Sequence, residues 1–282
     1  GSTGMLGHQI VQYLSKFDKY EIHDISMKKK LRQSTVILDV VEIELLVKLI
    51  TRLKPEIIIN CIGLLIKGSS NKAMAIYLNS LFPNQLKEIA NSVGSKMIHI
   101  STDCVFSGYK GKYNETDYRD GNGVYAQTKI LGEIIDDTNL TLRTSIVGPE
   151  LKDNGEGLFH WFMSQSCNIS GYTKDIWSGV TTLELAKAVV WSINEKVTGL
   201  YHITNNSSIS KCELLGLFKK YSKKDIKIIP VQGRKTNKSL VDTRKLLNYT
   251  IPTYDIMIKD MFDMISRNRL LYSQYLISNH VL

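Results

Sequence analysis

The chain has 282 residues, of which 43% are hydrophobic and 22% are charged. This length predicts one large domain or a domain with an appendage, and this composition excludes a disordered, collagen-like or disulfide-scaffold protein. The net charge is +9, but residues 201–282 contain 14 Lys and Arg against 6 Asp and Glu, so the basic excess lies in the C-terminal third.

No part of the sequence indicates a membrane segment or a metal site. The longest apolar stretch, Ile57–Ile66, is interrupted by Asn60 and is much shorter than the roughly 20 residues that span a bilayer. No secretory signal is recognisable. The four cysteines form no CxxC pair and lack the spacing of a zinc site or a disulfide framework. We therefore expect a cytoplasmic protein that holds no metal and does not associate with membranes.

Helical and extended patterns alternate through the first half of the chain. In chain order, apolar periodicity and β-branched runs predict a helix near 10–17, strands at 20–25 and 35–38, a helix at 43–50, a strand at 56–61, a helix at 73–93, a strand at 96–100, a helix at 125–135 and a strand at 140–147. This alternation predicts βαβ units and a doubly wound parallel sheet. After Gly148 the alternation weakens, and we expect a helix at 183–193, a strand at 199–204 and a helix at 210–221 capped by Ser210.

The first seven residues carry the pattern G-x-x-G-x-x-G, formed by Gly1, Gly4 and Gly7, and lead into the first helix. A loop of this kind brings backbone N–H groups close to a pyrophosphate at the helix N-terminus. Asp24 stands 17 residues after Gly7, at the end of the next strand, where a carboxylate binds the ribose hydroxyls of adenosine. Because Lys28–Lys30 follow and can receive a 2′-phosphate instead, the cofactor is NADPH or NADH, and the sequence leaves that choice open.

One expected element has no residues to form it. In a dinucleotide-binding fold the glycine loop follows the first, central strand of the sheet, yet the sequence begins at the loop. We therefore expect an α/β fold of the Rossmann type whose first strand is missing from the chain. The dinucleotide-binding domain is predicted at 1–147, with 178–205 returning to it, and a smaller irregular α/β substrate lobe at 148–177 and 206–282.

A second group of residues suggests chemistry on a carbonyl compound. Ser101, Thr102 and Asp103 end a predicted strand, and Tyr125-x-x-x-Lys129 follows 23 residues after Thr102. Tyr and Lys at this spacing share one face of a helix, where an ammonium can lower the pKa of the phenol. A hydroxyl at the strand end completes an acid and hydroxyl pair around a ketone.

In this order the motifs resemble a known family, the extended short-chain dehydrogenase/reductases, and within it the sugar-nucleotide reductases of the dTDP-4-dehydrorhamnose reductase group. The resemblance covers most of the chain and rests on Gly1–Gly7, Leu38–Val40, Lys54–Asn60, Asn79, Ser101–Gly108, Tyr113-x-Glu115-x-Asp117, Tyr125–Glu133, Leu142–Ser145 and Ser239–Asp242.

The resemblance implies an NADPH- or NADH-dependent enzyme that reduces a keto group on a nucleoside-diphosphate-linked deoxy sugar, for the synthesis of a surface polysaccharide sugar. Tyr125 would protonate the ketone oxygen as hydride arrives. Lys129 would hold the nicotinamide ribose and lower the pKa of Tyr125, and Thr102 would bind the substrate oxygen.

Further contacts follow from the resemblance and the loop pattern together. The expected cofactor contacts are Gly1, Thr3, Gly4, Met5, Leu6, Gly7, Asp24, Asp39, Val40, Cys61, Ile62, Gly63 and Lys129. The expected substrate contacts are Asp103, Cys104, Val105, Trp177, Lys211 and Ser239. The segment Trp177–Thr182 resembles the loop that meets the sugar nucleotide in this family, although a helix start capped by Thr181 or Thr182 explains it equally well.

Cys104 leaves a second reaction open. The rhamnose-pathway reductases usually show Tyr at this position, and the related GDP-fucose synthases carry an epimerising cysteine two residues after the threonine, assisted by a histidine. An epimerase-reductase would use Cys104 with His160 or His202. The alternative is that Cys104 is a small apolar packing residue.

Two hypotheses come from other functional classes. A relative that binds dinucleotide and only regulates a partner enzyme would not need the set of Thr102, Tyr125 and Lys129. Nucleic-acid binding by the basic lobe lacks any interleaving of aromatic and basic residues, so we expect none. The two phosphates of a nucleotide sugar explain the charge better, with Lys211, Arg234, Lys235, Lys238 or Arg244 as candidate partners. A homodimer through the helix of Tyr125 is possible, but Ile130, Leu131 and Ile134 fit a core as well.

Overall fold

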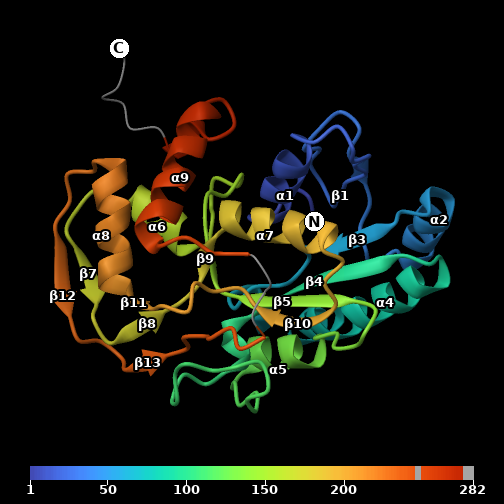
Figure 1. The fold of residues 1–282 in the computed structure, drawn as a ribbon. Coiled ribbons are helices and arrows are strands. Elements are labelled where there is room, and N and C mark those ends of the chain that lie inside the picture. Colours follow the sequence, from blue (N-terminus) through green and yellow to red (C-terminus); the bar gives the residue numbers. More distant parts are fainter. Residues whose placement is uncertain (245–248, 276–282) are drawn as a thin grey trace.

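A sheet of four parallel strands lies at the centre of the protein (Figure 1). The computed structural model describes residues 1–244 and 249–275. The sheet has the order β10 (Gly199–His202), β5 (Leu140–Thr144), β4 (Lys96–Thr102) and β3 (Ile57–Asn60). All three pairings are parallel. Every residue of β5 is buried, as expected of a strand that is covered on both faces.

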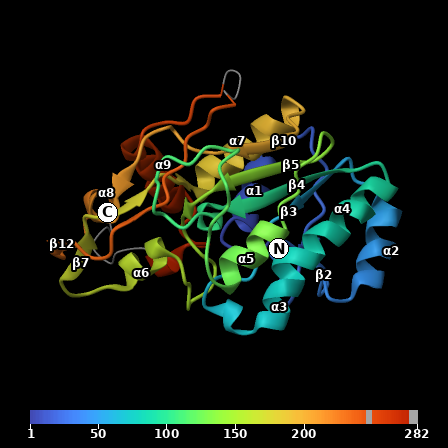
Figure 2. The same cartoon turned by 90° about the horizontal axis from the view of Figure 1, so that it is seen from below.

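Helices cover both faces of this sheet. In Figure 1, α1 (Gly7–Leu14) and α7 (Thr182–Asn194) lie above the strands, and α4 (Phe82–Ser92) and α5 (Val124–Leu131) lie below them. The view from below shows α4 and α5 in front of the sheet (Figure 2), with α2 (Ile43–Leu53) beside α4. The predicted doubly wound α/β fold is therefore confirmed. No helix in the described ranges is long and apolar enough to cross a membrane.

A second, two-stranded parallel sheet pairs β1 (Ile25–Ser26) with β2 (Val36–Ile37). The strand predicted at 20–25 is therefore much shorter in the structure. Only its last residue, Ile25, belongs to β1, because β2 pairs with Ile25 and Ser26 alone. The amino group of Gly1 and the backbone N–H of Ser2 each donate to the Ile25 carbonyl at 2.9 Å. This contact places the glycine loop against β1.

The helix predicted at 73–93 changes its winding in the middle. It consists of α3 (Lys72–Ile76), a π-helical turn at Tyr77–Leu81, and α4. Pro83 lies in the first turn of α4. A proline has no N–H and its ring crowds the carbonyl four residues earlier, here that of Asn79, which explains a wider turn at this point.

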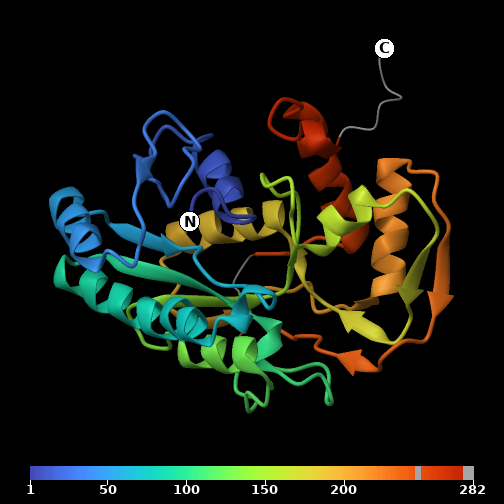
Figure 3. The same cartoon turned by 180° about the vertical axis from the view of Figure 1, so that it is seen from behind.

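The remaining elements form a lobe beside the sheet, seen from behind in Figure 3. Its helices are α6 (Leu158–Ser164), α8 (Lys211–Ser222) and α9 (Tyr254–Arg267), and its strands are β7 (Ile169–Tyr172), β8 (Asp175–Trp177), β11 (Ile209–Ser210), β12 (Ile228–Val231) and β13 (Thr236–Asn237). Two further short strands, β6 (Ile146–Val147) and β9 (Val180–Thr181), pair in parallel between sheet and lobe. Ser210 caps α8 in a capping box with Glu213, as predicted.

Buried apolar residues connect these parts. One large cluster extends from Leu140 and Leu142 of the sheet to Phe218 of α8 and Met261 of α9. A small cluster of Val105, Phe106, Tyr113 and Leu240 joins the loop after β4 to the segment after β13. Three short 3₁₀ turns complete the described elements: Gly68–Ser70, Asp103–Val105 and Ser273–Tyr275.

Candidate functional site

The glycine loop forms a close turn at the start of α1. A Cβ atom on Gly7 would lie 2.1 Å from the Gly1 carbonyl oxygen, so only glycine permits this approach. The Gly4 N–H donates to the Gly1 carbonyl at 3.0 Å. Within the described residues, the backbone N–H groups of Met5 and Leu6 make no hydrogen bond. The turn and its unpaired donors therefore fit the pyrophosphate of a dinucleotide at a helix N-terminus.

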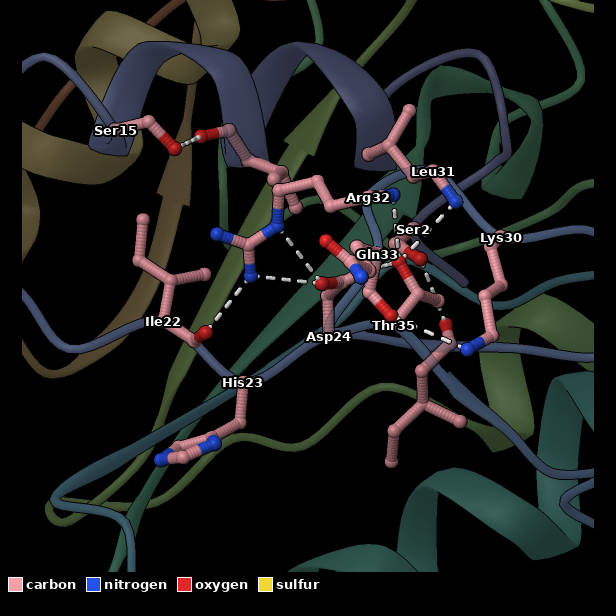
Figure 4. Close-up of polar contacts among 12 residues, drawn as sticks. Ser2, Ser15, Ile22, His23, Asp24, Lys30, Leu31, Arg32, Gln33 and Thr35 are labelled. Carbon is pink, nitrogen blue, oxygen red and sulfur yellow. Dashed lines mark hydrogen bonds and ion pairs between the residues drawn. The ribbon is translucent and has the colours of Figure 1, made fainter.

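Asp24 is held in a polar cluster beside this loop (Figure 4). Its Oδ1 accepts from Arg32 Nη2 at 2.7 Å and from Nε at 3.0 Å, and its Oδ2 accepts from the Thr35 hydroxyl at 2.7 Å. Burial would raise the pKa of the Asp24 carboxyl, but hydrogen bonds from Thr35, Arg32 and Ser2 together lower it. Asp24, which the sequence predicts to bind the ribose, thus already accepts hydrogen bonds from Arg32 on one carboxylate oxygen and from Thr35 on the other.

The other expected cofactor contacts lie after β2 and β3. Asp39 and Val40 follow β2, and the Val40 carbonyl accepts from the Tyr77 hydroxyl at 3.2 Å. Cys61–Gly63 follow β3, and the Asn79 side chain bonds both the N–H and the carbonyl of Leu64 at 2.8 and 3.0 Å. Asn79 therefore fixes the segment that would form the floor of the cofactor site.

Tyr125 and Cys104 line a pocket of about 340 Å³. Gly123, whose φ is 89°, precedes α5 and turns the chain so that Tyr125 lies in the first helical turn. The Thr102 hydroxyl is close enough to Tyr125 to lower the pKa of the phenol. Its own hydrogen bonds are local: it donates to Asp103 Oδ1 and accepts from the Cys104 N–H, both at 3.1 Å. The two residues, 23 positions apart in the sequence, therefore lie near each other, with the threonine proton directed to Asp103.

Lys129 lies one turn after Tyr125 but its ammonium donates to the Ile100 carbonyl at 2.8 Å. Burial lowers the pKa of Lys129 to about 8. Burial raises the pKa of Tyr125 and nearby Cys104 adds to this, while Thr102 lowers it. In this structure, therefore, it is Thr102 rather than Lys129 that acts on the phenol.

Cys104 and Asp103 lie near Lys238, a residue of the lobe beside the sheet. Lys238 lines the same pocket as Cys104 and Tyr125. Burial and the neighbouring Asp103 raise the pKa of the Cys104 thiol to about 11, against a smaller lowering by Lys238. Burial also raises the pKa of Asp103, opposed by Lys238. The thiol is therefore protonated at neutral pH, with an ammonium beside it.

The structure places the other expected substrate contacts outside the lining of this pocket. Trp177 is buried, and its indole N–H donates to the Ser145 hydroxyl at 2.9 Å. Lys211 pairs with Asp175 at 3.0 Å. The Ser239 hydroxyl accepts from the Lys112 N–H at 2.8 Å, and Val105 belongs to the small apolar cluster. Thr181 caps α7 by accepting from the Glu184 N–H at 3.1 Å, which explains part of the segment after Trp177.

The two histidines proposed as partners of Cys104 are engaged elsewhere. His160 Nδ1 lies 2.7 Å from the Tyr275 hydroxyl. His202 Nε2 accepts from Arg143 at 2.8 Å, and its Nδ1 lies 3.0 Å from the Val241 carbonyl. Because an arginine can only donate, His202 must be neutral with its proton on Nδ1. Neither ring forms a pair with the thiol.

Several pocket residues carried no recognisable signal in the sequence. The lining adds Ile66, Ser69, Ser70, Asn122, Val124, Ala126 and Lys238 to Cys104, Gly123 and Tyr125. Of these, only Lys238 was among the candidate phosphate partners, as one of several basic residues. The 3₁₀ turn at Gly68–Ser70 brings the two serines to the pocket from the loop after β3.

Comparison with known proteins gives a consistent result. Residues 1–245 match the RmlD substrate binding domain family. A dTDP-4-dehydrorhamnose reductase of Aggregatibacter actinomycetemcomitans is 27% identical over 224 residues, which cover 74% of this chain and 73% of the relative. The β subunit of methionine adenosyltransferase 2 of Xenopus laevis is 24% identical over 234 residues, covering 76% of this chain and 68% of the relative.

Among solved structures, a dTDP-4-dehydrorhamnose reductase from Bacillus anthracis in complex with NADP superposes with a TM-score of 0.81. The match covers 94% of this chain and 97% of that structure at 21% sequence identity. This likeness confirms the Rossmann-type fold.

Proposed function

Because the chain belongs to the RmlD substrate binding domain family, we propose that it is an NADPH- or NADH-dependent reductase of a keto group on a nucleoside-diphosphate deoxy sugar. The observation that carries this proposal is the pocket that Tyr125 shares with Lys238 and with Cys104, two residues after Thr102. An acid and a cation around one cavity suit the binding and protonation of a sugar ketone.

In the proposed reaction Tyr125 donates its phenolic proton to the ketone oxygen. A bound nicotinamide in its reduced form supplies the hydride. The Thr102 hydroxyl would bond the same oxygen in place of its present bond to Asp103 Oδ1. Lys129 is buried and has a pKa lowered to about 8, and its ammonium is bonded to the Ile100 carbonyl, so in this proposal it holds the nicotinamide ribose rather than acting on the phenol.

For the cofactor we propose NADPH in preference to NADH. The Asp24 carboxylate is neutralised by Arg32, whose side chain is 31% exposed. Lys28–Lys30 are exposed on the same loop. A free carboxylate would repel a 2′-phosphate, whereas a paired carboxylate with a group of cations beside it attracts one.

For the substrate we propose that Lys238 binds an oxygen of the sugar nucleotide. Its side chain reaches the pocket of Tyr125, while Arg234 and Lys235 are exposed. This placement supports a role for Lys238 at the sugar of the sugar nucleotide. The remaining basic residues of the lobe would then lie near its phosphates. We also propose that the reaction serves the synthesis of a surface polysaccharide sugar.

An assay of the purified protein tests the function directly. It is incubated with NADPH or NADH and a panel of nucleotide-linked 4-keto-6-deoxy sugars, and the loss of absorbance at 340 nm is followed, a standard readout of nicotinamide oxidation. We expect turnover with at least one sugar. Tight binding of the cofactor without turnover on any sugar would contradict a reductase and favour a regulatory subunit.

The epimerase-reductase is the weaker alternative. The Cys104 thiol has a pKa raised to about 11, and both candidate histidines are bonded to other residues. Lys238 remains beside the thiol, so a proton shuttle between these two is the form of epimerisation that the geometry favours. Solvent deuterium at a carbon next to the ketone, lost in Cys104→Ser, would establish it.

We further propose a cytoplasmic homodimer that forms through α5. Leu131 at the end of this helix is 66% exposed and Ile135 just after it is 56% exposed, whereas Ile134 is buried. Two large apolar side chains exposed close together in the chain support pairing of two copies, and light scattering coupled to size exclusion would measure it. A monomer at micromolar concentration would contradict the dimer.

A further inference from the structure

A buried hydrogen-bonded chain connects the C-terminal part of the protein to the glycine loop. The Tyr272 hydroxyl lies 3.0 Å from His8 Nε2, and His8 Nδ1 lies 2.8 Å from the Gly4 carbonyl oxygen. His8, Gln9 and Tyr272 are each no more than 1% exposed. The contact joins residues that are 264 positions apart in the sequence. Burying three polar side chains costs free energy unless they are hydrogen-bonded. We therefore ask what these hydrogen bonds contribute to the protein.

The proton positions in this chain follow from the donors and acceptors. Burial lowers the pKa of His8 to about 4, so the ring is neutral and carries one proton. The Gly4 carbonyl can only accept, which puts that proton on Nδ1. His8 Nε2 is then an acceptor, and the Tyr272 hydroxyl or the Gln9 amide must donate to it. Gln9 also donates to the Tyr272 oxygen. The Tyr272 hydroxyl has one proton and two acceptors for it, His8 Nε2 at 3.0 Å and Gln12 Oε1 at 3.1 Å.

This chain determines the direction of one peptide group in the loop. The Gly4 carbonyl accepts from both the His8 ring and the His8 backbone N–H, the latter at 3.2 Å. A trans peptide is planar, so its carbonyl and the following N–H point in opposite directions. Fixing the Gly4 carbonyl toward His8 therefore turns the unpaired N–H of Met5 away from the helix, toward the place where a phosphate would bind.

The same C-terminal segment also bonds a segment that lies near Met5. The Tyr275 hydroxyl accepts from the Glu150 N–H at 3.0 Å, and Glu150 Oε1 accepts from the Gly157 N–H at 2.7 Å. At Gly157 an added Cβ would lie 2.8 Å from the Met5 Cε atom. Tyr275 is therefore linked, through Glu150, to the segment beside the Met5 side chain, whereas Tyr272 contacts His8 directly.

We propose that Tyr272 is a positioning residue for cofactor binding, which acts through His8 to set the orientation of the Gly4–Met5 peptide. The inference rests on the proposed dinucleotide site but assigns a function to residues outside it. Tyr272 touches neither cofactor nor substrate. Its hydroxyl keeps the His8 ring in the orientation from which Nδ1 donates to Gly4.

The test measures dissociation constants for NADPH and NADH by fluorescence in the full-length protein. Tyr272→Phe should weaken binding of both cofactors about threefold to tenfold, the effect of one lost hydrogen bond, while kcat at saturating cofactor stays unchanged. His8→Asn keeps an N–H donor for the Gly4 carbonyl and should bind better than His8→Ala. In the His8→Asn background, Tyr272→Phe should have no further effect, because the path from hydroxyl to loop is already broken.

Tyr249→Phe is the matched control. It also removes a part-buried phenol bond, here to Glu184 Oε1 at 2.7 Å. Among the described residues, Tyr249 makes no hydrogen bond to the glycine loop. Cofactor binding should be unchanged in this variant. Equal dissociation constants in Tyr272→Phe and the unmodified protein would overturn the inference, as would additive effects of Tyr272→Phe and His8→Asn.

Hydrogen exchange of residues 1–8 gives a readout that does not depend on the cofactor. Tyr272→Phe should increase exchange at the glycine loop, and Tyr249→Phe should not. If the unmodified protein binds neither cofactor, the proposed function fails, while faster exchange in Tyr272→Phe would still support the link to the loop. Unchanged exchange would overturn that link by itself.

Discussion

Arg143 and Glu133 form a two-point ion pair in the interior of the protein, with Nε to Oε1 at 2.8 Å and Nη2 to Oε2 at 2.7 Å. Their side chains are 1% and 0% exposed. The third guanidinium nitrogen donates to His202 at 2.8 Å, and Arg119 adds a contact to Glu133 at 2.9 Å. The pair therefore connects β5 to the turn after α5 and to β10. In the pairing of β4 with β5, Arg143 lies opposite Ser101, the residue before Thr102.

Arg143→Met should destabilise the protein by about 3–5 kcal/mol, because it leaves the Glu133 carboxylate buried without its main partner. Urea unfolding would measure the loss. Lys110→Met, which removes the more exposed pair with Asp117 at 2.6 Å, should cost no more than about 1 kcal/mol. Equal losses of unfolding free energy in the two variants would show that the buried pair stabilises the protein no more than the exposed pair does.

Tyr125→Phe should lower kcat by about 10²–10⁴-fold, since it removes the proposed proton donor and leaves the fold intact. The dissociation constant of NADPH should change little, because the phenol lies in the substrate pocket. Steady-state kinetics and fluorescence titration would measure the two effects separately. Full activity in this variant would eliminate Tyr125 as the acid.

Lys238→Met should raise KM for the sugar nucleotide about tenfold and leave the cofactor affinity unchanged, because a charge-assisted hydrogen bond is lost at the pocket only. Lys235→Met, three residues away and exposed, is the control. A change of equal size in both variants would mean that Lys238 acts only through the general charge of the lobe.

Arg32→Ala should shift the cofactor preference toward NADH. The substitution removes the cation from Asp24, so the carboxylate becomes free to accept ribose hydroxyls and to repel a 2′-phosphate. We expect the ratio of the NADPH to the NADH dissociation constant to rise by about tenfold, the effect of roughly 1.4 kcal/mol. An unchanged ratio would contradict the role of the Asp24–Arg32 pair in cofactor choice.

The stability of the protein should fall as the pH falls from 6.5 toward 4. Burial lowers the pKa of His8 and of His202 to about 4 and that of His99 well below the ordinary value of 6.5. Below pH 6.5 the unfolded chain binds protons that the folded chain excludes, so each histidine removes up to about 1.4 kcal/mol per pH unit. Above pH 6.5 this contribution is complete.

Urea unfolding at pH 7, 6 and 5 would measure this dependence. His202→Asn should make it less steep, and His23→Asn should leave it as it is because His23 is 41% exposed. Carboxylates with lowered pKa values, such as that of Glu133, lose their contribution only at lower pH, below about 4.5. A constant free energy of unfolding between pH 7 and 5 would contradict the prediction.

Local patterns predicted much of this arrangement. The glycine spacing forms a turn whose Gly7 tolerates no side chain, and Thr102 lies at the end of β4, near Tyr125. Both features depend on neighbours in the sequence or on the common edge of a parallel sheet, so periodicity and spacing suffice to find them.

Local patterns could not predict contacts between segments that are distant in the sequence. Nothing in the sequence near Asp24 shows that Arg32 would fold back onto it, and Lys238 does not differ in pattern from Lys235. The Tyr272–His8 contact depends on how the C-terminal segment packs on α1, which no local signal encodes. The extent of β1 also depends on its partner strand rather than on its own residues.

Lys238 belongs to the chain of the lobe, yet its neighbours are bonded to the other part of the protein. The Asn237 N–H donates to the Gly108 carbonyl at 2.8 Å, and the Ser239 carbonyl accepts from the Tyr113 N–H at 2.8 Å. These two bonds attach the residues on either side of Lys238 to the loop that follows Thr102. The position of Lys238 at the pocket is therefore determined by that loop as well as by the packing of the lobe to which it belongs.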